Sequence, residues 1–78
     1  MNLNGTNISD IKVLEKVNFK ELKELDLNNN KISDIKVLEK VKFDKLEILN
    51  LSENQISDKE NETIIKKLKS KLKDGFDI

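Results

Sequence analysis

The same ten-residue segment occurs twice in this chain, in copies that lie 24 positions apart. The segment ISDIKVLEKV runs from Ile8 to Val17 and again from Ile32 to Val41. The same offset aligns Leu3, Leu27 and Leu51. Composition alone does not produce a match of this length, and internal periods of about 20 to 50 residues are typical of stacked supersecondary units. The repeat therefore predicts a stack of similar units.

Each unit contains two kinds of apolar spacing. Leu25 and Leu27 alternate with polar residues, as side chains on a short β-strand do. Ile35, Leu38 and Val41 recur at every third residue, as in a helical or 3₁₀ segment. We therefore expect each unit to run as strand, turn, helix and return. Because one such unit cannot enclose its own apolar side chains, we expect neighbouring units to cover them.

The pattern LxxLxLxxNxI is complete in two places, from Leu22 to Ile32 and from Leu46 to Ile56. It resembles the consensus of the leucine-rich-repeat family. The spacing after the asparagine is similar to the short-repeat type found in protein-phosphatase regulatory subunits, although Phe19 and Phe43 make these units slightly longer. The resemblance implies an α/β fold: a leucine-rich-repeat solenoid with a short parallel sheet on its concave face, short helices on its convex face and a C-terminal capping helix.

The resemblance also implies a role for Asn30 and Asn54. In the family, an asparagine at this position binds backbone groups at the tight turn after the strand, and successive asparagines form a ladder through the stack. The first unit departs from the pattern, because Thr6 stands at the ladder position. A hydroxyl makes fewer hydrogen bonds than an amide, so we expect the first unit to be looser.

The repeat pattern ends at Ile56, and the following segment is typical of a longer helix from Ser57 to Gly75. Ser57 and Glu60 have capping-box spacing, and Gly75 suits a left-handed helix stop. The apolar residues form one stripe: Ile64, Ile65, Leu68 and Leu72. Phe76 and Ile78 then repeat the strand alternation. We therefore expect the 78 residues to form one domain, with repeats over 1–56 and a C-terminal cap over 57–78.

The lysines of the expected helix have two interpretations. A cationic amphipathic helix is suited to anionic membranes or to a calmodulin-like partner. The apolar stripe is, however, needed to cover the end of the core. We therefore favour a helix whose lysines form the solvated face, and expect no membrane binding.

Composition excludes several classes of function. The chain has no Cys and no His, so the usual thiolate and imidazole metal sites and nucleophilic pairs are absent, and we expect no cofactor. Formal net charge is +0 and all 15 basic residues are lysines, which argues against nucleic-acid binding. No apolar run approaches membrane-spanning length and no export signal precedes Leu3, so we expect a cytoplasmic protein.

The carboxylates have structural explanations. Asp10, Asp34 and Asp58 recur once per unit and would suit Ca²⁺ if stacked, but each follows a serine at the start of a helical segment, which favours capping. Glu24 and Asp26 lie close together on an open sheet without the cleft that acid–base catalysis needs, so we expect no enzyme. Four Asn-x-Ser/Thr triplets, at Asn4, Asn7, Asn50 and Asn61, are attributed to chance in a chain rich in Asn and Ser.

The family resemblance places partner binding on the residues that flank the inward leucines. Asn2 and Asn4 hold these positions in the first unit. In the next two units they are Glu24, Asp26, Asn28, Ile48, Asn50 and Ser52. We expect this face to bind another protein, weakly because it is narrow. A merely solvated strand face stays open as an alternative, since these positions contain no aromatic residue and no arginine to anchor an interface. The alternative is a self-assembling unit: Met1 to Asn4 gives only a stub of strand, so either residues precede it or two chains associate through the N-terminal end.

Overall fold

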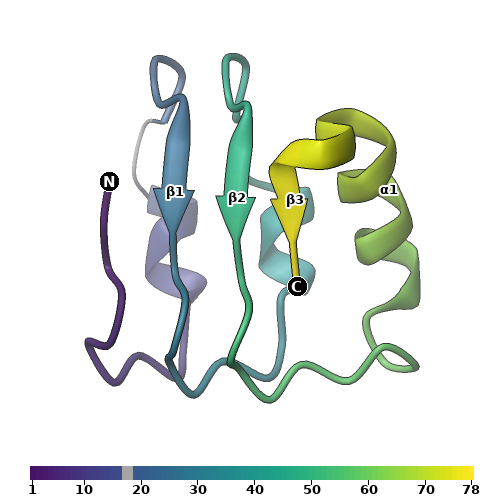
Figure 1. Cartoon of the computed structure of the whole chain (residues 1–78). Helices are drawn as coiled ribbons and strands as arrows, with labels where there is room; N and C mark the ends of the chain where they lie inside the picture. The colour runs from purple at the N-terminus through teal and green to yellow at the C-terminus, as the bar shows by residue number, and fades with distance from the viewer. Residues whose placement is uncertain (17–18) are drawn as a thin grey trace.

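In the computed structural model, residues 1–16 and 19–78 are described, and short strands alternate with short helical segments (Figure 1). The strands are β1 (Glu24–Asp26), β2 (Ile48–Asn50) and β3 (Phe76–Asp77). The helical elements are the 3₁₀ helices η1 (Lys12–Lys16), η2 (Lys36–Glu39) and η3 (Lys73–Gly75), and the α-helix α1 (Glu62–Leu72). Val17, which closes the first copy of the repeated segment, lies outside the described residues.

The strands form one parallel sheet in the order β1-β2-β3. Leu25 pairs with Leu49, so the two strands are in the register that the 24-residue period predicts. Figure 1 shows β1 and β2 side by side, with η1 and η2 on the far side of the sheet. The predicted strands, their parallel pairing and the short helical segments are therefore confirmed, and together they make an α/β repeat fold.

The apolar side chains of successive units share one core. The most deeply buried are Leu25, Leu27, Ile32, Ile35, Leu49 and Leu51. Leu25 and Leu27 have their counterparts Leu49 and Leu51 one unit along the chain, Ile35 has its counterpart Ile11 one unit back, and all of them belong to a single cluster. At about 25 cal/mol per Å² of apolar surface removed from water, this shared burial is the main stabilising contribution. The core thus depends on contacts between units.

The asparagine ladder is present at both predicted positions. Asn30 Nδ2 donates to the carbonyl oxygens of Leu27 at 2.9 Å and of Leu3 at 3.0 Å, and Asn30 Oδ1 accepts the Ile8 N–H at 2.9 Å. Asn54 repeats this arrangement one unit later. Each amide therefore ties its own turn to the turn of the preceding unit.

The first unit has a hydroxyl where the others have an amide. Thr6 Oγ1 donates to the Leu3 carbonyl oxygen at 2.8 Å and lies 3.4 Å from Asn30 Oδ1. Leu3 and Ile8 are only half-buried, whereas their counterparts in the second unit are fully buried. The looser first unit stays a prediction, and this difference in burial is its physical basis.

The two phenylalanines that lengthen the units pack against each other. The rings of Phe19 and Phe43 are stacked, with centroids 5.5 Å apart and planes 21° from parallel, and both side chains are buried. The extra length of each unit therefore supplies an aromatic contact between successive units.

The C-terminal helix begins later than the sequence predicts. The prediction of a helix from Ser57 is wrong, because residues 58–61 form a turn and α1 starts at Glu62. Ser57 Oγ accepts the Glu60 N–H at 3.4 Å, so the capping-box residues stabilise this turn instead. The predicted apolar stripe of α1 is buried in the shared core, as expected: Ile64, Ile65, Leu68 and Leu72.

The delayed start of α1 follows from Asn61, which is 2% exposed. Its Oδ1 accepts the Ile35 N–H at 3.1 Å, and its Nδ2 donates to the carbonyl oxygens of Ser33 at 3.1 Å and Ser57 at 2.9 Å. These bonds join the start of α1 to the start of η2. The triplet that begins at Asn61 is thus a buried structural contact and not an accessible glycosylation site.

Gly75 does not provide the left-handed stop that the sequence predicts. The residue with positive φ at the end of α1 is Lys73, at 52°, and the chain then makes the 3₁₀ turn η3. A Cβ added to Gly75 would lie 1.9 Å from the Glu47 carbonyl oxygen. Glycine is therefore needed for close approach to the backbone before β2. The predicted last strand is present as β3, although Ile78 is 39% exposed.

Candidate functional site

A hollow of about 230 Å³ lies on the exposed face of the sheet. We call it the strand hollow. It is lined by Met1, Asn2, Glu24, Leu25, Asp26, Ile48 and Asn50. These residues come from β1, β2 and the N-terminal segment that pairs with β1, and Figure 1 shows that the three segments lie side by side. Four of the six predicted partner-binding residues are therefore brought together in one place.

The parallel register sets the arrangement of these four residues. Glu24 lies opposite Ile48, and Asp26 lies opposite Asn50. Leu25 and Leu49 between them point into the core, so their neighbours point out of the sheet. Two rows of outward side chains therefore cross the strands. In one row the Glu24 carboxylate lies beside the aliphatic Ile48, and in the other the Asp26 carboxylate lies beside the Asn50 amide.

The other two predicted residues, Asn28 and Ser52, bind each other. Ser52 Oγ lies 2.8 Å from Asn28 Oδ1 and 2.7 Å from Asn50 Oδ1. Both residues are half-buried, and neither lines the strand hollow. Their polar groups stabilise the ends of β1 and β2, so they are less available to a partner than the four residues of the hollow.

A repeated turn fixes the backbone beside the hollow. The side-chain oxygens of Asn2, Asp26 and Asn50 each accept the N–H of the residue two positions later, at 2.9, 2.9 and 3.0 Å. Such local side-chain bonds order the backbone at strand ends. The outward side chains of neighbouring strands are thus held in matching positions.

Two residues of this face were not among the predicted set. Met1 lines the hollow and is 52% exposed, and Asp77 extends the row of Asp26 and Asn50 because it pairs with Asn50. The 24-residue period does not identify Asp77, since the register pairs Leu49 with Phe76 and not with the residue one period later. The alternation of Phe76 and Ile78 was the signal from which its outward position follows.

The exposed aliphatic side chains are concentrated at the hollow. Among the described residues, the large exposed hydrophobic side chains are Met1, Ile48 at 45% and Ile78. Two of the three line the strand hollow. Ile48 is one of the expected partner-binding residues, and it is exposed as its place beside the inward Leu49 predicts.

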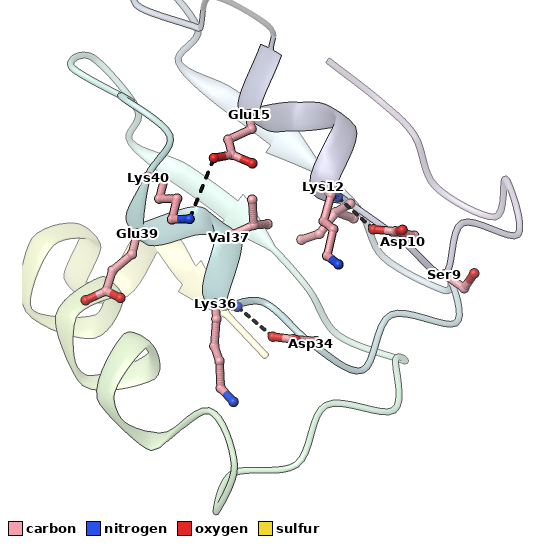
Figure 2. Close-up of a pocket in the computed structure, with 10 residues that line it drawn as sticks. Ser9, Asp10, Lys12, Glu15, Asp34, Lys36, Val37, Glu39 and Lys40 are labelled. Carbon is pink, nitrogen blue, oxygen red and sulfur yellow. Dashed lines mark hydrogen bonds and ion pairs between the residues drawn. The ribbon is translucent and has the colours of Figure 1, made fainter.

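A second and larger hollow, of about 510 Å³, lies between η1 and η2 (Figure 2). Its charges are mixed, and an ion pair 3.9 Å long joins Lys40 to Glu15 beside it. Asp10 Oδ1 accepts the Lys12 N–H and Asp34 Oδ1 accepts the Lys36 N–H, both at 2.9 Å. Each aspartate thus binds the first N–H of its 3₁₀ helix, as a capping role predicts, although Ile35 and not Asp34 is the cap residue of η2. The same prediction for Asp58 is wrong, because Asp58 lies in the turn before α1. In the described ranges no group of acidic residues is arranged to hold a metal ion.

The lysines of α1 lie on its exposed side. Lys66 pairs with Glu62 at 2.9 Å, Lys67 contacts Glu39, and Lys71 Nζ donates to the Phe43 carbonyl oxygen at 2.7 Å. These contacts run along α1 or to the neighbouring unit. No helix in the part of the chain that the structure describes is both long and apolar enough to cross a membrane.

Comparison with known families agrees with this geometry. The model of the family described as "Leucine Rich repeats (2 copies)" matches residues 1–40 and 20–64. The chain belongs to the leucine-rich-repeat family. Leucine-rich repeats are generally protein-protein interaction modules, and members of the family typically have no enzymatic activity. No curated protein and no solved structure matches this leucine-rich-repeat chain.

Proposed function

We propose that this chain is a protein-binding module whose partner docks in the strand hollow. The observation that carries the proposal is that two exposed aliphatic side chains, Met1 and Ile48, line the same hollow on an ordered sheet. Exposed apolar side chains in a hollow with a polar rim are typical of interaction sites. The same proposal gives the chain no catalytic step of its own.

The backbone beneath the hollow is suited to binding without rearrangement. Leu25 and Leu49 beneath it are almost completely buried, and the turns of Asp26 and Asn50 hold the strand ends. A partner would therefore meet side chains that are already in place, which lowers the entropy cost of association. Ile48 supplies the apolar contact and the polar rim supplies the hydrogen bonds.

The width of the sheet limits the affinity. Parallel strands lie about 4.8 Å apart, so three strands and the N-terminal segment present a face about 10 to 15 Å wide. A standard interface needs about 800 Å² from each partner. We therefore expect weak binding by this chain alone.

The finer architecture belongs to the same proposal. We infer that the units form a leucine-rich-repeat solenoid of the short-repeat type, with the strand hollow on its concave side and the 3₁₀ helices on its convex side. The period of 24 residues and the short helical segments η1 and η2 support this assignment. Residues 1–56 are then the repeats and 57–78 the cap.

Truncation of Ile48 tests the binding site. Peptides are selected from a random display library on the immobilised full chain, and their affinities are measured for the native chain, Ile48→Ala and Ile78→Ala. We expect Ile48→Ala to weaken binding by about 5-fold or more, the loss typical of an interface residue worth about 1 kcal/mol. Ile78→Ala removes the same side chain outside the hollow and should bind as the native chain does. Equal affinity for all three proteins would refute the proposed site.

A second candidate function is self-association through the N-terminal edge of the sheet. Leu3 N donates to the Asp26 carbonyl oxygen at 2.8 Å, and Asp26 N donates to the Met1 carbonyl oxygen at 2.9 Å. In a parallel pair these alternate residues face the neighbouring strand, so the backbone groups of Asn2 face outward. An outward strand edge is a template for pairing with another chain.

The concentration dependence of mass tests this second candidate. If chains pair through this edge, sedimentation equilibrium should show a mass that rises with concentration, and N-methylation of the Asn2 backbone nitrogen in a synthetic chain should prevent the rise. The control is the Ser70→Ala variant, which changes a side chain on the exposed side of α1 and should associate as the native chain does. A strict monomer at all concentrations would exclude self-association.

A further inference from the structure

The charged side chains that line the strand hollow are all negative. Its lining contains the carboxylates of Glu24 and Asp26 and no lysine. Asp77 adds a third carboxylate, since it pairs with Asn50 at the edge of the lining. The larger hollow between η1 and η2 differs, because lysines there are interleaved with the acidic residues. The two carboxylates outweigh the Met1 ammonium group, so the strand hollow is locally acidic in a chain of formal net charge +0.

Four of the described lysines form ion pairs with carboxylates outside the strand hollow. The ion pairs join Lys40 to Glu15, Lys45 to Glu21, Lys66 to Glu62 and Lys67 to Glu39. None of these pairs involves a residue of the strand hollow. The Met1 ammonium group donates to the backbone carbonyl oxygen of Glu24 at 2.8 Å and not to its carboxylate. The carboxylates of the hollow therefore have capacity to bind a cation from a partner.

One carboxylate has a defined free position. Asp26 Oδ1 accepts the Asn28 N–H, which orients the group and leaves Oδ2 as a further acceptor. Glu24 lies two residues earlier on the same strand, opposite the exposed Ile48. An aliphatic surface and two carboxylates thus occur within one hollow.

We propose that the partner of the strand hollow is a protein segment with a lysine or arginine next to an aliphatic residue. The inference rests on the proposed function, and it names the chemistry of the partner. The aliphatic side chain contacts Ile48 and Met1, and the cationic side chain binds Glu24 and Asp26. A cation of this kind also contributes its own methylene groups to the apolar contact.

Two double variants with the same change in net charge test this chemistry. In the first, Glu24→Gln and Asp26→Asn neutralise the hollow; asparagine at 26 keeps the acceptor for the Asn28 N–H, as Asn50 does for Ser52. In the second, Asp44→Asn and Glu60→Gln neutralise two exposed carboxylates outside the hollow. Both proteins retain the residues of the core, so both are expected to fold.

The probe is the peptide pool selected on the native full chain. We expect the pool to be enriched in Lys or Arg adjacent to Leu, Ile, Val or Met. The first double variant should bind a selected peptide about 2- to 10-fold more weakly, as expected for two exposed charge pairs, and the second should bind like the native chain. Added salt should weaken binding to the native chain more than to the first double variant.

The outcomes separate this inference from the proposed function. Peptides that lose affinity with Ile48→Ala but carry no excess of cations, or that bind both double variants equally, would overturn the cationic partner and leave the strand hollow as the site. Peptides whose affinity is unchanged by Ile48→Ala, or a selection that yields no binding peptide, would overturn both the cationic partner and the strand hollow as the site.

Discussion

Asn54 binds the backbone of Ile32 in the preceding unit, because its Oδ1 accepts the Ile32 N–H at 2.9 Å. Its Nδ2 donates to the carbonyl oxygens of Leu27 and Leu51, both at 3.0 Å. One amide therefore holds two successive turns, and both its donor and its acceptor are needed.

The first prediction concerns this amide. Asn54→Asp keeps the acceptor for Ile32 but replaces the donor with an oxygen that faces the Leu27 and Leu51 carbonyls. We expect the free energy of unfolding to fall by roughly 1 to 3 kcal/mol, the cost of unpaired polar groups that are largely buried. Urea denaturation measures it. Gln55→Glu is the control, since it makes the same chemical change in an exposed side chain; equal losses in both variants would contradict the ladder's role.

Glu53 provides a prediction about backbone strain. Its φ is 57°, in the left-handed region, and the equivalent residues Gly5 and Asn29 have φ values of 65° and 57°. Asparagine and glycine tolerate this region better than glutamate does. We expect Glu53→Asn to raise the free energy of unfolding by about 0.5 to 1 kcal/mol. Thermal denaturation should therefore show a higher melting temperature. The reverse change, Asn29→Glu, should lower it, and a change of the same sign in both variants would argue against strain at this position.

A third prediction follows from the close approach of Gly75 to the backbone before β2. Gly75→Ala places a methyl group where the Glu47 carbonyl oxygen lies, so η3 and β3 must shift. We expect a loss of about 1 to 3 kcal/mol, as for other overpacked sites, and faster hydrogen exchange of the Leu51 N–H that donates to Asp77. Ser70→Ala, at an exposed position of α1, should change neither quantity. Retention of native exchange in Gly75→Ala would show that β3 does not depend on this contact.

The stacked phenylalanines allow a test of coupling between units. Phe19→Leu and Phe43→Leu each remove one ring of a pair whose centroids are 5.5 Å apart. A double-mutant cycle on the free energy of unfolding should give a coupling of about 0.5 to 1.5 kcal/mol. A cycle on Phe19→Leu and Ser70→Ala, a change in an exposed side chain of α1, is the control and should be additive. Additivity of the two phenylalanine changes would mean that the rings do not interact.

Much of the repeat region was predictable because its signals are periodic. The alternation at Leu25 and Leu27 and its recurrence at Leu49 and Leu51 fix the strands and their register, since a one-residue slip would expose the leucines. Asn30 and Asn54 were identified from the family pattern, and their hydrogen bonds confirm it. Exposure of Ile48 followed from its place beside an inward leucine.

The C-terminal segment was predicted less well because its structure depends on long-range contacts. Ser57 and Glu60 have the spacing of a helix start. The side chain of Asn61, however, forms hydrogen bonds with the backbone of Ser33 and Ile35, and α1 begins only after Asn61. Gly75 looked like a helix stop, yet the backbone near Glu47 is what requires it. The backbone groups that Asn61 and Gly75 contact in these two cases lie more than 20 residues away in the sequence. Asp77 was missed for the same reason, because α1 shifts β3 out of the regular period.

The most direct test of a binding site in the strand hollow is a map of backbone amide chemical shifts in the full chain during titration with a selected peptide. We expect the largest changes at Glu24, Asp26, Ile48 and Asn50, and small changes around the hollow between η1 and η2. If the largest changes instead fall at Asp10, Lys36 and Lys40, the partner binds on the opposite side and the proposed site is wrong.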